Sequence, residues 1–153
     1  MKENLLKSMQ YEEWANAIVL QSLRQSTDIG ERLPQLFAHI LAPQSIWLSR
    51  IRHEVPLVGL WPELTLDECA QMMAENLKQW RAFINAAAPE DFYKSVAFKL
   101  PNSDKERSMA VYEVVAHLTN HGTYHRGQII LGLKGKTERL PLTTYIAFLA
   151  SLD

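Results

Sequence analysis

The chain has 153 residues, 47% of them hydrophobic, and 16 Lys and Arg residues nearly balance 17 Asp and Glu residues. This length predicts one domain, residues 1–153, which can bury a sizeable core. The sequence has no long basic run that would favour nucleic-acid binding, and no apolar run of the roughly 18 residues that suggest a membrane-spanning helix. With one cysteine, Cys69, it forms no intrachain disulfide and no multi-cysteine metal site. The charged start lacks a signal-peptide core, so we expect a cytoplasmic protein that binds neither nucleic acid nor membrane.

Two long helices are expected in the first third of the chain. Residues 3–26 place four apolar side chains on one helical face: Leu5, Met9, Leu20 and Leu23. Residues 34–53 carry a second apolar stripe, interrupted by Pro43. A proline there removes a backbone hydrogen bond and crowds the carbonyl of His39, four residues earlier. We therefore expect a kink near His39.

The third expected helix begins after Thr65. Glu68 lies three residues later, which is the spacing of a capping box. The helix should continue to about Ala88, because Pro89 follows.

Residues 93–110 differ from the rest of the chain. They contain two short candidate strands around the turn-rich stretch PNSDKE, which predicts a small hairpin or an extended loop. Residues 109–134 predict the fourth helix, closed by Gly135, and residues 141–152 a short fifth helix. Together these elements predict an all-α protein: an antiparallel four-helix bundle with an extra C-terminal helix.

Three of the five histidines lie four residues apart in HLTNHGTYHRGQIILGL. At about 100° per residue, His121 and His125 face the bundle interior, and His117 lies on a flank. Imidazoles at positions i and i+4 can share one ion, so 121/125 and 117/121 are both possible pairs, and burial favours the first. Two inward histidines can instead hydrogen-bond to other side chains. The H-x-x-x-H spacing alone is a weak metal signal.

Three neutral imidazoles and a water molecule make a typical catalytic site, so a third ligand is needed. His39, His53 and His117 are the remaining histidines. His53 has the character of a surface residue, and His39 lies off the main apolar stripe of its helix. Periodicity does not choose among them. Since neither H-E-x-x-H nor Glu-x-x-His occurs, a zincin-type protease and a ferritin-like di-iron site are not supported.

LFAHILAPQSIWLSRI, followed some eighty residues later by VVAHLTNHGTYHRGQIILGL, resembles the DinB-like (DinB/YfiT) family of metalloenzymes, as does YEEWAN in the first helix. The resemblance covers nearly the whole chain. It implies a bundle that is usually dimeric, with a three-histidine metal site made by His39, His121 and His125. It also implies a divalent ion, most often zinc or nickel. Some relatives join a low-molecular-weight thiol to an electrophile, and others are proposed hydrolases or isomerases.

The chain departs from the family pattern at two positions. Pro43 stands where a small helix former is usual, and Thr144 lies near where relatives often carry an aspartate. Neither change removes a ligand. We therefore expect a divalent-metal-binding protein that acts on a small molecule as a thiol-dependent transferase or hydrolase. A non-catalytic dimeric bundle with a structural or vestigial site is the alternative.

Several other residues have simple expected roles. Arg126 should pair on the surface, and Glu113 should pair with His117. Cys69 should be a small buried residue, although its place at a helix N-terminus would lower its pKa. The four tryptophans should be core or interface residues. Candidates for orienting the histidine rings are Asn120, Tyr124, Glu113 and Gln44.

Overall fold

The computed structural model describes residues 1–100 and 102–152. In chain order its elements are α1 (Lys2–Gln25), α2 (Arg32–Ile51), α3 (Leu66–Ala86), the 3-10 turn η1 (Pro89–Tyr93), β1 (Ser95–Lys99), β2 (Glu106–Ala110), α4 (Val111–Gly132) and α5 (Tyr145–Ala150). The expected helical bundle, with a hairpin before its fourth long helix, is confirmed. In the described part of the chain, no helix combines the length and the apolar character needed to cross a lipid bilayer.

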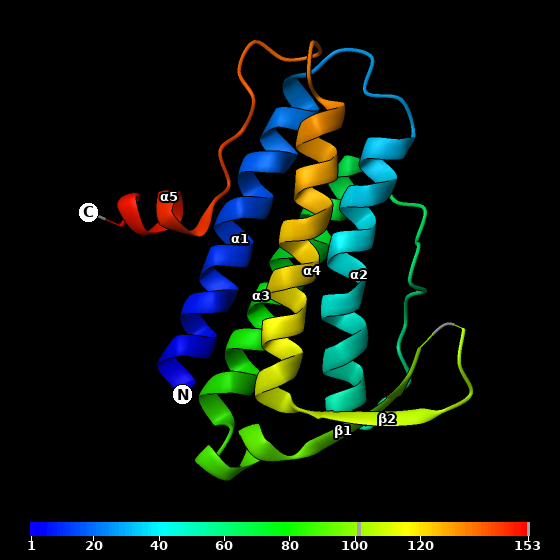
Figure 1. Cartoon of the computed structure of the whole chain (residues 1–153), viewed down its shortest axis with the longest axis vertical. Helices are drawn as coiled ribbons and strands as arrows, with labels where there is room; N and C mark the ends of the chain where they lie inside the picture. The colour runs from blue at the N-terminus through cyan, green and yellow to red at the C-terminus, as the bar shows by residue number, and fades with distance from the viewer. Residues whose placement is uncertain (101, 153) are drawn as a thin grey trace.

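The four long helices do not simply alternate in direction. α1 and α4 run one way, and α2 and α3 run the other (Figure 1). A hydrogen bond and an ion pair, one at each end of α1, show that α3 is antiparallel to it. Lys2 near its start donates to the Asn85 carbonyl near the end of α3, and Arg24 near its end pairs with Asp67 near the start of α3.

Because α2 and α3 are parallel, the chain between them must return along the length of the bundle. Residues 52–65 form this crossover, which runs beside α2 in Figure 1. Two hydrogen bonds fix the parallel register. Asn76 Nδ2 donates to the Leu41 carbonyl at 3.0 Å, and Trp80 Nε1 donates to the Gln44 carbonyl at 2.9 Å. The bundle is therefore not antiparallel at every step along the chain, and this long connection contributes residues to the site.

Local signals in the sequence explain most helix ends. Thr65 and Glu68 form the expected capping box at the start of α3. At the start of α4, the Glu113 carboxylate accepts the Ala110 N–H at 2.7 Å, so its expected pairing with His117 is wrong. Gly135 has a φ of +79°, a conformation that favours glycine. α2 continues through Pro43 to Ile51, eight residues beyond the proline.

The core lies between the long helices. At the hairpin end, α3 contributes the buried Trp80 and Ile84, and α4 contributes Val114 and Leu118. Beyond the histidines, α2 and α4 meet again through residues such as Phe37 and Ile129. The two helices are therefore held together on both sides of the segment that carries the histidines.

Candidate metal centre

The structure brings together three of the five histidines. His39 comes from α2, and His121 and His125 come from successive turns of the facing α4. One ring nitrogen of each lies within 4.8 Å of the others. The closest pair is Nε2 of His39 and Nε2 of His121, which are 3.2 Å apart. The antiparallel packing of two helices thus assembles a triad from residues 82 positions apart in sequence.

The crossover holds the ring of His39 in place. Nδ1 of His39 lies 2.8 Å from the carbonyl oxygen of Leu60. A carbonyl can only accept, so Nδ1 carries the proton and Nε2 presents a lone pair to the triad. The indole of Trp61 stacks on the same ring, with centroids 3.5 Å apart and planes 2° from parallel. Two consecutive crossover residues therefore set both the tautomer and the orientation of His39.

His125 is held in a comparable way from its own helix. Its Nδ1 donates to Oε1 of Gln128 at 2.8 Å, one helical turn later. The Nε2 lone pair is therefore free to face the other two rings. A hydrogen bond from the non-ligating nitrogen to a neutral acceptor is the arrangement that orients metal-binding histidines in known sites.

His121 lacks such a partner. Its Nδ1 is buried and forms no hydrogen bond with the described residues. If Nε2 carries the proton, Nδ1 is an orphaned acceptor. If Nδ1 carries it, the Nε2 lone pairs of His121 and His39 face each other at 3.2 Å. Burial, followed by the charges of His125 and His39, lowers the pKa of His121 to about 3, so this ring is neutral at physiological pH.

These features fit a divalent metal ion. One ring nitrogen of each histidine lies close to those of the other two, and a cation between them would replace a repulsive contact with three favourable ones. His39, His121 and His125 would hold it, and the protein would leave one or more coordination positions open. An all-imidazole donor set suits several divalent first-row metals.

The other two histidines lie outside the triad. His117 is exposed, and its ring centroid is 5.8 Å from that of His121 and 5.9 Å from that of Trp47. His53 is exposed beyond the end of α2. The flank position expected for His117 and the surface position expected for His53 are both confirmed.

A family comparison agrees with this geometry. The model of the DinB family matches residues 1–147. The chain belongs to the DinB family. No curated protein and no solved structure matches it. Family membership and the triad together support a DinB-like protein that is able to bind a divalent metal ion.

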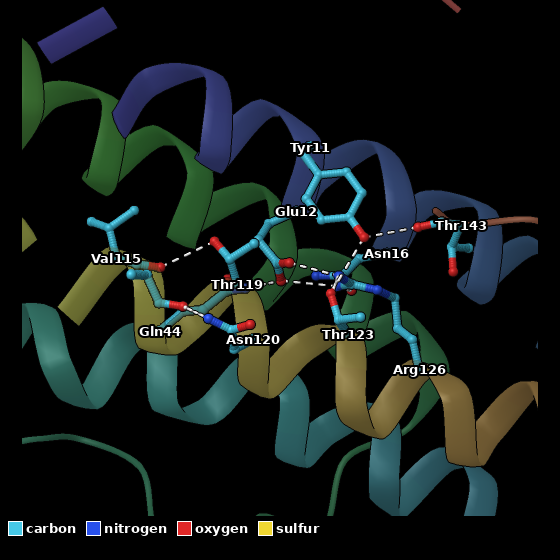
Figure 2. Close-up of polar contacts among 11 residues, drawn as sticks. Tyr11, Glu12, Asn16, Gln44, Val115, Thr119, Asn120, Thr123, Arg126 and Thr143 are labelled. Carbon is cyan, nitrogen blue, oxygen red and sulfur yellow. Dashed lines mark hydrogen bonds and ion pairs between the residues drawn. The ribbon is translucent and has the colours of Figure 1, made fainter. Parts of the chain in front are cut away.

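A second polar cluster in this DinB-family chain lies between α4 and α1, and Figure 2 draws it. Arg126, expected on the surface, is 1% exposed, and that expectation is wrong. Its Nη2 and Nη1 donate to the two carboxylate oxygens of Glu12 at 2.7 and 2.9 Å, and Nη1 also donates to Asn16. Burial raises the pKa of the Glu12 carboxyl, and the Arg126 guanidinium opposes this shift. We call Glu12, Asn16 and Arg126 the buried ion-pair cluster.

The buried ion-pair cluster explains a glycine in the middle of α4. A Cβ atom on Gly122 would lie 2.3 Å from Oε2 of Glu12 and 2.7 Å from Nη1 of Arg126. Gly122 therefore leaves room for the ion pair rather than for a substrate. Gly127 has open space around it.

Of the four residues expected to orient the rings, only Tyr124 contacts one: its ring packs edge-on against that of His125, with centroids 4.9 Å apart. Glu113 caps α4, and Asn120 donates to the Ala116 carbonyl of its own helix. Gln44 bonds to Glu12 and Asn76 instead of a histidine. The observed partners are Leu60 and Gln128. The i, i+3 spacing of His125 and Gln128 could have revealed the second, whereas a backbone carbonyl such as that of Leu60 carries no signal in the sequence.

Two further expectations concern Cys69 and Trp61. Cys69 is buried, and burial raises its pKa to about 11, so the expected small buried residue is confirmed and the lowered pKa is wrong. Trp80 and Trp47 are core residues, but Trp61 is 43% exposed and covers the His39 ring. Trp61 therefore belongs to the site and not to the core.

Proposed function

We propose that this DinB-family chain is a metal-dependent enzyme that acts on a small molecule. Thiol-dependent S-transfer is the reaction we favour, and hydrolysis is the alternative. The observation that carries the proposal is the triad itself: three imidazoles from two facing helices, two of them already oriented by neutral acceptors. A purely structural cluster of histidines would be expected to satisfy its own ring nitrogens, and Nδ1 of His121 is not satisfied.

A divalent ion held by three neutral ligands keeps its full positive charge, and it lowers the pKa of a coordinated thiol or water. Zinc or nickel is the proposed ion. Among the described residues, the acceptors that hold the triad rings are a backbone carbonyl and a side-chain amide. In the described part of the chain, no carboxylate is hydrogen-bonded to these rings to act as a base. This favours a thiol over water, because a thiol, with an ordinary pKa of about 8.5, loses its proton more readily without a base.

In the proposed S-transfer, the thiol loses its proton to solvent. Its sulfur then forms a bond to an electrophilic carbon, whose leaving group departs with the electron pair of the broken bond. The chain supplies orientation: Leu60 and Trp61 fix His39, and Gln128 fixes His125. These side chains limit the directions from which a thiol can approach the triad.

The homodimer implied by the family resemblance is part of the proposal. α5 and the segment before it offer a candidate surface, because Leu142 and Ile146 are 63% and 76% exposed. Light scattering of the purified chain would measure its mass in solution, and the proposal expects twice the 17.5 kDa of one chain.

A conjugation assay tests the function. Zinc- or nickel-loaded protein is mixed with a small thiol and an electrophile such as 1-chloro-2,4-dinitrobenzene, and loss of the thiol is followed. We expect acceleration that is lost in His121→Ala and retained in His117→Ala, which removes a neighbouring imidazole outside the triad. If the loaded protein accelerates neither conjugation nor ester hydrolysis, the non-catalytic bundle becomes the better description.

A further inference from the structure

We propose that Arg50 binds a carboxylate group of the small molecule that reaches the triad, so that the protein selects anionic thiols over neutral ones. The link between Arg50 and the triad rests on the proposed function. The binding of a carboxylate by Arg50 does not depend on it and can be tested without metal.

Arg50 lies on the same face of α2 as His39. The two residues are eleven positions apart, close to three full turns, which corresponds to about 16 Å along the helix axis. Pro43 and Ile46 lie between them on this face. The crossover runs beside α2 in Figure 1, and residues of both line one cavity.

The structure has a cavity of about 270 Å³ between α2 and the crossover. Apolar residues form most of its wall: Pro43, Ile46, Trp47, Pro56, Val58 and Leu60. Arg50 is the one charged residue among the described residues that line it. A single cation in an apolar wall is the arrangement that fixes the orientation of a small ligand.

The guanidinium of Arg50 has no anionic partner among the described residues, in contrast to that of Arg126. Its Cζ lies 4.7 Å from the centroid of the Trp47 ring, which holds it in place from one side. Burial lowers its pKa, as expected for a cation that has lost water without gaining a counter-charge. A bound carboxylate would supply that charge through two parallel hydrogen bonds.

Nearby carboxylates do not take this role. A second cavity, of about 640 Å³, also touches Arg50 and is lined by Asp91, Lys94 and His53. The Asp91 carboxylate is already engaged, by Lys94 Nζ at 2.7 Å and by the N–H of Ala88 at 2.8 Å. The guanidinium of Arg50 is therefore available to bind a ligand.

The triad histidines are not among the described residues that line the cavity, but Leu60 and Trp47 in its wall contact His39 and His117. Leu60, in its wall, is the residue whose carbonyl holds His39. Trp47, also in its wall, packs edge-on against His117, which is next to His121. A flexible molecule with a thiol at one end and a carboxylate at the other would therefore span from the triad to Arg50 along this face of α2.

One guanidinium in apolar surroundings favours a singly charged group. A carboxylate matches the planar fork of arginine and leaves the pair neutral, whereas a dianionic phosphate would leave one negative charge in an apolar cavity. We therefore assign the subsite to a carboxylate.

The first experiment uses metal-free protein, so that no ligand can bind to an ion. Hexanoate and its neutral analogue hexanamide are titrated into the protein, and NMR follows the Nε–H resonance of Arg50. We expect hexanoate to bind about tenfold more tightly, since hydrogen bonds between charged groups are about twice as strong as neutral ones. This preference should disappear in Arg50→Gln and persist in Arg52→Gln, because Arg52 already donates to Gln79 at 2.9 Å.

The second experiment uses Co²⁺-loaded protein, in which a thiolate-to-cobalt charge-transfer band reports the thiol end of the ligand. 11-Mercaptoundecanoate and 11-mercaptoundecan-1-ol, comparable in length to the distance of about 16 Å between His39 and Arg50, are compared. We expect the acid to bind about tenfold more tightly to wild type. In Arg50→Gln the two thiols should bind equally, with the affinity for the alcohol unchanged.

The outcomes separate the two proposals. Equal binding of hexanoate and hexanamide to wild type, or a preference that survives in Arg50→Gln, would overturn the Arg50 subsite. A normal preference for hexanoate together with no thiolate band from either thiol would support the subsite and count against the thiol-dependent function. Thermal unfolding of Arg50→Gln, expected close to wild type, excludes a folding defect as the cause.

Discussion

α4 presents two polar clusters on neighbouring faces, one towards α1 and one towards α2, and they are built on different principles. Towards α1, Arg126 meets Glu12 and Asn16, so donors face acceptors and opposite charges neutralise each other. Towards α2, His121 and His125 meet His39, and three like groups face one another. Each cluster leaves one buried nitrogen without a hydrogen-bond partner among the described residues, Nε of Arg126 and Nδ1 of His121, but only the second places like groups against one another.

The difference separates a structural role from a functional one. The buried ion pair fixes the register of α1 against α4, and Gly122 leaves room for the side chains of this pair. A triad of imidazoles adds no such attraction by itself, and the buried, unpartnered Nδ1 of His121 favours a ligand at this place. The ion-pair cluster thereby positions the helix that carries two of the three histidines.

Breaking the ion pair should have the largest effect on stability. Arg126→Met leaves the Glu12 carboxylate buried without its partner, and we expect a loss of about 3–5 kcal/mol in the free energy of unfolding. Urea unfolding of the metal-free protein measures it. A double variant, Glu12→Leu with Arg126→Met, should recover much of the loss, because no charge is then left buried. A single variant as stable as wild type would show that the pair does not hold the bundle.

Loss of a ring-orienting partner should affect metal binding more than folding. Gln128→Ala removes the acceptor that holds Nδ1 of His125, and we expect metal affinity to fall about 10–100-fold. Competition with a chromogenic chelator measures the affinity. Asn120→Ala, which removes an amide bonded to its own helix, is the matched control and should bind as wild type does. Equal affinity in both variants would contradict the assigned role of Gln128.

Gly122→Ala should lower the free energy of unfolding, by less than the loss of the ion pair does. Although alanine is the better helix former, its Cβ would overlap Glu12 and Arg126, and we expect a loss of about 1–3 kcal/mol in stability. Gly127→Ala meets open space and should instead stabilise the helix by up to about 1 kcal/mol. Chemical unfolding of the two variants gives the comparison, and equal changes in both would argue against the crowding.

The smallest effect should come from mild acid, near pH 6, on the metal-free protein, and it should grow as the pH falls further. The pKa of His121 is about 3 in the folded chain and near 6.5 when unfolded, so the unfolded state binds more protons between these values. Stability should therefore be full above about pH 6.5 and fall as the pH drops towards 3. In His121→Phe the loss of stability between about pH 6.5 and 3 should be smaller. If the dependence of unfolding free energy on pH is the same in that variant, other titrating groups cause the loss.

Sequence reasoning reached the helices, the hairpin and the capping box, because each depends on local periodicity or on a short motif. The triad was reached through family resemblance, since periodicity left His39, His53 and His117 undecided. Arg126 was misplaced because its partner Glu12 lies 114 residues away, and no local pattern reports such a pairing. Leu60 and Trp61 were missed because the crossover places them on His39, and the direction of α3 decides where the crossover runs.

The most direct test of the account is the metal content of the chain itself. Protein purified without an affinity tag or chelator is dialysed against zinc, and metal per chain is measured by mass spectrometry. Wild type, His117→Ala and His53→Ala are expected to hold close to one ion per chain, and His39→Ala, His121→Ala and His125→Ala to hold almost none. A wild-type chain that takes up no zinc, nickel or manganese, or a His121→Ala variant that binds as much as wild type, would contradict the metal centre described here.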